Sequence, residues 1–162
     1  MENILQNLQE TIKRVRSSHS SHSKSIFYTD TITPDIMAGI ERWYTKGHTN
    51  ETILLLTNKI KNNFWGYLNT GICITDKAIY CRLQPDTYLS SLTLKRNILV
   101  FPLYEIKSIA LGKRDHCYGN SYEGHQLIIN NKVVGLIRMG KNIFYDEDMI
   151  TDLIRIFKAF QK

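Results

Sequence analysis

The sequence predicts a mainly β protein with flanking helices, in which seven antiparallel strands form a barrel or sandwich that a C-terminal α-helix caps. Three observations predict this fold. Seven short runs of apolar and β-branched residues follow one another after residue 51. Most of these runs are joined by links of hairpin length, which favours antiparallel pairing over a parallel sheet. Helical periodicity precedes the runs in an N-terminal segment and returns after residue 146.

The hairpin around a two-residue turn at 76–77 is the centre of the predicted sheet, because apolar residues stand on both sides of a polar corner. This turn would pair Ile74 with Ile79, and Ile72 with Cys81. Side chains alternate along a strand, so these four residues would share one apolar face. A hairpin alone is barely stable in water, so further strands or a helix must cover that face.

The other strands are short and are separated by polar or proline-containing links. Asn130 and Asn131 suit a tight hairpin turn, since Asn accepts positive φ. Residues 112–124 are polar and contain several glycines, so we expect a loop there. The expected strands span residues 52–57, 68–75, 78–83, 98–101, 106–111, 126–129 and 132–138.

The N-terminal segment, residues 1–50, is expected to be helical and to lie outside the β-domain, residues 51–162. Its first helix, 2–16, has an apolar stripe with helical spacing. The stripe could pack on the chain's own β-domain, or it could serve self-association or the docking of a partner. Basic residues at the end of this helix suit the helix macrodipole without a functional role. The stripe consists of Leu5, Leu8, Ile12 and Val15.

A Ser- and His-rich linker at 17–25 is expected to separate the first helix from a second one. His19 and His22 lie at a spacing that could hold a metal, but no further ligands stand nearby, so we expect no metal site. Thr33 as N-cap and Pro34 at the first helical position predict the start of the second helix.

The final helix is expected to begin at about Asp146. Acidic residues crowd its first turn and lysines stand at its end, as the macrodipole prefers. A wide apolar stripe predicts that this helix packs on the sheet and stabilises it. The expected stripe is Met149, Ile150, Leu153, Ile154, Phe157 and Phe160.

Charge is distributed unevenly along the chain, whose formal net charge is +6. Residues 51–145 carry 12 Lys and Arg against 6 Asp and Glu, which either favours an acidic partner or gives an ordinary solvated surface. No run of residues is long and apolar enough for a membrane-spanning helix. Three cysteines without paired spacing favour a reducing compartment. We therefore expect a cytoplasmic protein, with peripheral association at a membrane as an alternative.

Three segments resemble motifs of bacterial pleckstrin-homology-like (PH-like) and GRAM-like domains. They are 71–80 (GICITDKAIY), 101–109 (FPLYEIKSI) and 127–134 (LIINNKVV), and the resemblance covers about residues 51–160. It implies seven strands followed by one helix, and a binding module without catalytic activity. Phosphoinositide binders of this family carry basic residues in the first inter-strand loop and on strand two. Residues 67–75 contain no Lys or Arg, which argues against inositol phosphate recognition.

The sequence therefore predicts a non-enzymatic binding or adaptor module for a protein partner, or for an acidic or membrane-surface partner. One alternative is an oligomeric scaffold assembled through the N-terminal helices, and a remote alternative is nucleic-acid binding. The fields of basic residues from three expected loops would add if these residues cluster. The candidate ligand-binding residues are Lys59, Lys61, Lys95, Arg96, Lys113 and Arg114.

One group of residues suggests catalysis. A His beside Cys117 could activate its thiol, with His125 also in the vicinity. Neighbouring residues on a strand point in opposite directions, however, and a loop with several glycines fixes no geometry. The sequence contains no phosphate-binding glycine loop, paired-carboxylate motif or metal quartet. We therefore predict no enzymatic activity, no cofactor and no metal.

Overall fold

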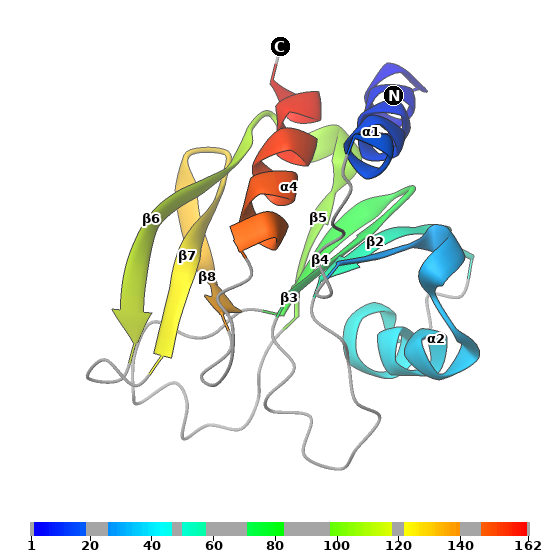
Figure 1. Ribbon diagram of the computed structural model, residues 1–162, viewed down its shortest axis with the longest axis horizontal. Coiled ribbons are helices and arrows are strands. Elements are labelled where there is room, and N and C mark those ends of the chain that lie inside the picture. The colour runs from blue at the N-terminus through cyan, green and yellow to red at the C-terminus, as the bar shows by residue number, and fades with distance from the viewer. Residues whose placement is uncertain are drawn as a thin grey trace.

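The computed structural model describes residues 2–18, 26–46, 50–57, 71–82, 98–117, 122–139 and 147–161. These residues form two antiparallel sheets and several helices (Figure 1). No described helix has both the length and the apolar character needed to cross a bilayer. The helical elements are α1 (Glu2–Ser17), η1 (Thr29–Thr31), α2 (Pro34–Ile40), η2 (Glu41–Thr45), η4 (Leu103–Glu105), α4 (Glu147–Phe157) and η5 (Lys158–Phe160).

The larger sheet has five strands in sequence order, and each strand pairs antiparallel with the next. The predicted register of the central hairpin is confirmed: Ile72 pairs with Cys81, and Ile74 with Ile79. A Cβ atom on Gly71 would lie 2.6 Å from the carbonyl oxygen of Thr57, so only glycine fits where the hairpin begins. The strands are β1 (Ile26–Tyr28), β2 (Ile53–Thr57), β3 (Gly71–Thr75), β4 (Ala78–Arg82) and β5 (Leu99–Pro102).

The smaller sheet consists of β6 (Ile109–Cys117), β7 (Tyr122–Ile129) and β8 (Lys132–Met139). The predicted Asn turn is confirmed, since both asparagines have positive φ, 51° and 64°. The expected loop at 112–124 is wrong at both ends, because β6 runs on to Cys117 and β7 starts at Tyr122. The register of β6 shifts at a bulge between Leu111 and Arg114. Beyond the bulge, the residues of β6 pair with β7 again.

All seven predicted strands are present as β2–β8, with shifted ends. The strand that was not predicted is β1, which pairs with β2 at the edge of the larger sheet. Among the described residues the two sheets share no paired strands, so the closed-barrel alternative is wrong there. Backbone pairing would have to continue from one sheet into the other for a barrel to close.

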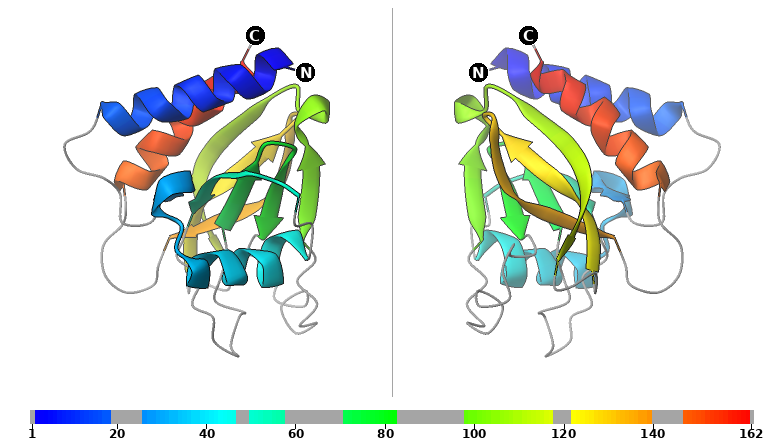
Figure 2. Two further views of the ribbon diagram at one scale, coloured as in Figure 1. Left: turned by 90° about the vertical axis from the view of Figure 1, so that its right-hand side faces the viewer. Right: turned by 90° about the vertical axis from the view of Figure 1, so that its left-hand side faces the viewer.

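The main core lies between the two sheets, and α1 and α4 cover it at one end (Figure 2). The inner face of the predicted hairpin belongs to this core, together with Leu8 of α1 and Leu153 of α4, both completely buried. The N-terminal part of α1 lies beside the last turns of α4, as both views in Figure 2 show. Residues from the first 50 positions and from the β-domain thus share one core.

A second apolar layer covers the other face of the larger sheet, where α2 and η2 pack on it. The predicted N-cap is confirmed, because the Thr33 side chain accepts a hydrogen bond from the amide of Ile36. The helix continues past α2 as a π-helical turn and stops at Lys46, which adopts the left-handed conformation. Tyr44 from this turn is fully buried against the sheet.

The apolar stripe of α4 differs from the predicted one at Ile154 and Ile156. Ile154 is 46% exposed, whereas Ile156 is completely buried. The correction follows from the helical period, since Ile156 lies three residues after Leu153 and four before Phe160, in the middle of the buried face. Ile154 lies beside that face and points to solvent.

Leu153→Ala should lower the free energy of unfolding by about 2–5 kcal/mol, because it leaves a cavity in a fully buried site. Ile154→Ala is the matched control on the same helix and should cost less than about 1 kcal/mol, since its side chain is half exposed. Urea unfolding followed by circular dichroism measures both values. Equal losses in the two variants would contradict this orientation of α4.

Candidate functional site

An open groove of about 530 Å³ lies between α1 and α4. The residues that line it on α1 recur every three or four positions, so they form one face of that helix. The other wall consists of the end of α4 and the start of η5. The groove is lined by Asn7, Thr11, Arg14, Val15, Ser18, Arg155, Lys158 and Ala159, and we call this set the basic groove.

The two walls of the basic groove are tied together at its floor. The Asn7 side-chain amide donates a hydrogen bond of 2.8 Å to the carbonyl oxygen of Ala159. Val15 and Ala159 are both buried and contribute to the main core. The Ser18 hydroxyl donates to the carbonyl oxygen of Val15 at 2.9 Å, which closes the last turn of α1. The floor is therefore apolar and fixed, while the rims are polar.

Three cationic side chains line the basic groove: Arg14 on one wall, and Arg155 and Lys158 on the other. None of the described lining residues is a carboxylate. The carboxylate of Asp152 lies beside them, with its Oδ1 3.9 Å from Nη1 of Arg155. Three cations that line one groove can attract anions.

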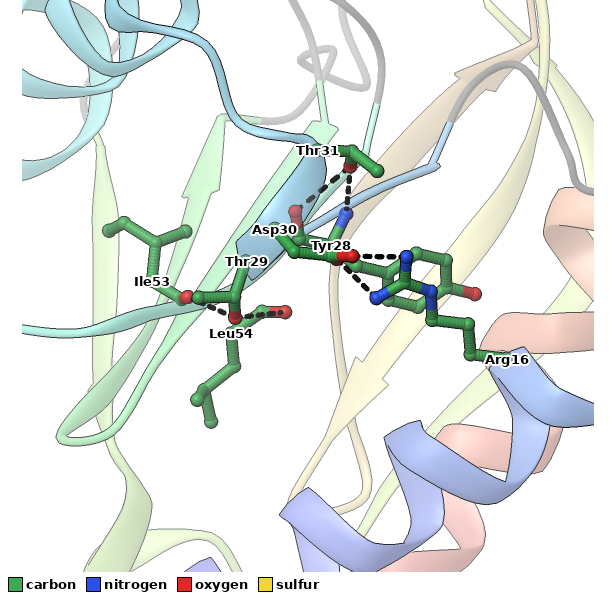
Figure 3. Close-up of polar contacts among 7 residues, drawn as sticks. All are labelled: Arg16, Tyr28, Thr29, Asp30, Thr31, Ile53 and Leu54. Carbon is green, nitrogen blue, oxygen red and sulfur yellow. Dashed lines mark hydrogen bonds and ion pairs between the residues drawn. The ribbon is translucent and has the colours of Figure 1, made fainter.

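The α1 wall is anchored to the larger sheet (Figure 3). Arg16 forms a bidentate ion pair with Asp30 in η1, and its guanidinium lies 5.5 Å from the centre of the Tyr28 ring. The hydrogen bonds from Arg16 lower the pKa of Asp30. Thr29 then donates to the carbonyl oxygen of Ile53 at 2.8 Å, which connects η1 to β2. These contacts hold the end of α1 in place beside the groove.

The Tyr28 side chain lies near Arg16 of α1 and near Asp152 of α4. Its side chain is buried, and this burial together with the nearby carboxylate of Asp152 on α4 raises the pKa of its hydroxyl to about 12. Arg16 on α1 acts in the opposite direction and lowers this pKa. Asp152 is itself only 3% exposed. A neutral tyrosine thus lies between an arginine of one helix and a carboxylate of the other.

The two sequence-predicted ligand residues that the structure describes do not line the basic groove. Lys113 and Arg114 are exposed on β6, next to its bulge, and belong to a strand where a loop was expected. The other four candidates lie outside the described residues, so their clustering stays a prediction: Lys59, Lys61, Lys95 and Arg96.

The apolar stripe of α1 lies inside the molecule. Leu8, Ile12 and Val15 are buried in the main core, and Leu5 packs against it. Of the two alternatives for this stripe, the structure therefore supports packing within the chain. Those four side chains are not a free surface for self-association or for a partner.

The three cations of the basic groove were not predicted as a site. Arg14 and Lys158 stand among the basic residues at the C-terminal ends of their helical segments, where the macrodipole alone accounts for them. The available signal was that both terminal helices are amphipathic and carry basic residues beside their apolar stripes. Neither pattern alone predicts that the two helices pack against each other.

The residues considered for catalysis lie on β6 and β7, and the side chain of Cys117 is not among those that the structure describes. His125 is on β7, with Nδ1 3.1 Å from the carbonyl oxygen of Gly112, and Cys117 ends β6. Cys73 and Cys81 are buried on opposite faces of the larger sheet, and burial raises the pKa of both thiols. The described residues contain no group of three or more side chains placed to hold a metal ion.

A second polar cluster lies under η2. The Trp43 ring is contacted by the guanidinium groups of Arg42 and Arg82, 4.9 and 4.5 Å from its centre. The Trp43 indole N–H, the Tyr44 hydroxyl and the Thr45 hydroxyl are buried and have no hydrogen-bond partner among the described residues. This cluster belongs to the layer between η2 and the sheet, and the basic groove is the more accessible site.

Tyr28 predicts a loss of stability at alkaline pH. Its folded-state pKa of about 12 exceeds the ordinary value of 10, so the folded protein keeps a proton that the unfolded chain releases. The contribution of Tyr28 is thus present below pH 10 and falls as pH rises to 12. Urea unfolding between pH 9 and 12 should show a shallower decline for Tyr28→Phe than for the unaltered protein. Identical declines would contradict this assignment.

Comparisons with known proteins give this chain no relative. No family model, no curated protein and no solved structure matches it. The proposed function therefore depends on the chain's own residues, above all on those of the basic groove.

Proposed function

We propose that this protein is a non-enzymatic binding module of PH-like fold that holds an acidic partner in the groove between α1 and α4. The support for the fold is the order of its elements, since seven antiparallel strands, β2–β8, are followed by the amphipathic helix α4. The segments that resemble PH-like motifs lie on the β3–β4 hairpin, around η4 and on the β7–β8 hairpin.

The observation that carries the proposal is the charge of the basic groove. Arg14, Arg155 and Lys158 line one concave surface, and no carboxylate lines it among the residues that the structure describes. A concave surface with one sign of charge concentrates anionic ligands and speeds their association. The net charge of +6 works in the same direction at longer range.

Binding, not catalysis, is what this arrangement supports. Guanidinium and ammonium groups bind carboxylates and phosphates through charge-assisted hydrogen bonds. The other lining residues that the structure describes supply an amide, two hydroxyls and two apolar side chains.

R14E/K158E should weaken binding of dextran sulfate at low salt at least about tenfold, which corresponds to about 1.4 kcal/mol, because both changes reverse charges inside the groove. Dextran sulfate serves as a polyanion that represents no particular class of partner. Isothermal titration calorimetry measures the dissociation constants.

K113E/R114E is the matched variant, since it makes the same change of net charge at an exposed site on β6. It should weaken binding less than R14E/K158E does. A larger loss in K113E/R114E would assign the anion site to β6 and would overturn the proposed role of the basic groove.

A further inference from the structure

We propose that the partner held in the basic groove is an acidic polypeptide segment that runs along the groove between α1 and α4. This inference depends on the proposed function and names the class of its ligand. It follows from the length of the groove, from the placement of its cations and from the kinds of side chain that line it.

The basic groove is elongated. On α1 its lining residues extend from Asn7 to Ser18, and eleven residues of α-helix span roughly 16 Å. A single phosphate or carboxylate would occupy only a small part of that length. A peptide of five or more residues in extended conformation would fill it.

The cations stand on both walls. Arg155 and Lys158 are three residues apart, so they lie on the same side of the second wall, while Arg14 faces the groove from α1. A chain lying between the helices would thus meet positive charge on both sides. Acidic side chains pointing alternately to the two walls, as they do in an extended peptide, could pair with both.

The lining chemistry favours a polypeptide over a nucleic acid. Single-stranded nucleic acids are held by aromatic side chains that stack on the bases, and none of the described lining residues is aromatic. The groove offers instead the Thr11 hydroxyl and the side-chain oxygen of Asn7, which can exchange hydrogen bonds with peptide groups. Its apolar floor, Val15 and Ala159, suits the methylene groups of glutamate.

The shape of the site favours a polypeptide over a membrane surface. Lipid headgroups form a broad, nearly flat layer, which reaches protruding basic side chains more easily than the floor of a groove between two helices.

The test measures three probes against the full-length protein at low salt: fluorescein-labelled octaglutamate by fluorescence anisotropy, phosphatidylserine-containing vesicles by co-sedimentation, and oligouridylate by anisotropy. Each probe is measured with the unaltered protein, with R14E/K158E and with K13E/K46E. Lys13 and Lys46 are exposed and do not line the groove, so K13E/K46E changes the net charge equally without altering the site. Circular dichroism verifies that both variants fold.

We expect octaglutamate to bind, R14E/K158E to weaken it at least tenfold and K13E/K46E to weaken it less than threefold. Groove-dependent binding of the vesicles or of oligouridylate, without octaglutamate binding, would overturn this inference while the proposed anion site would stand. If R14E/K158E and K13E/K46E affected every probe equally, both the inference and the proposed function would be wrong.

Discussion

The structure depends on the burial of one apolar face, the inner side of the β3–β4 hairpin. Ile72, Ile74 and Ile79 on this face are completely buried, because the smaller sheet, α1 and α4 cover them from different directions. Burial of each such side chain is worth roughly 1.5–3 kcal/mol. Removal of the smaller sheet, α1 or α4 would expose part of this face to water, so the face depends on all three. The basic groove is a by-product of this covering, since it lies where the two covering helices meet.

Much of this fold could be predicted from the chain because the relevant signals are local. A two-residue turn sets the register of the central hairpin, and the pairing of Ile74 with Ile79 follows from it. By contrast, β1 has three residues, too few to establish an alternating pattern, and it exists because β2 offers it a free edge. The extension of β6 to Cys117 was hidden for a similar reason: its polar residues pair with β7, and periodicity alone cannot show that.

The candidate site was harder to predict than the fold, because its residues are far apart in sequence. Arg14 and Arg155 each look like an ordinary surface residue on an amphipathic helix. Only the packing of α1 on α4 brings them to one groove, and the Asn7–Ala159 hydrogen bond that records this packing joins residues 152 positions apart. Of the six basic residues chosen from the sequence, the two that are described lie on β6. The other four lie outside the described residues, so whether the six cluster stays a prediction.

The walls of the groove come from opposite ends of the fold, and this has a consequence for synthesis on the ribosome. The residues of α1 emerge long before those of α4. The apolar stripe of α1 therefore stays exposed until α4 has been synthesised. Leu8 and Ile12 would be accessible to chaperones during that interval. The groove itself can form only after α4 and the start of η5 have been synthesised, because they supply its second wall.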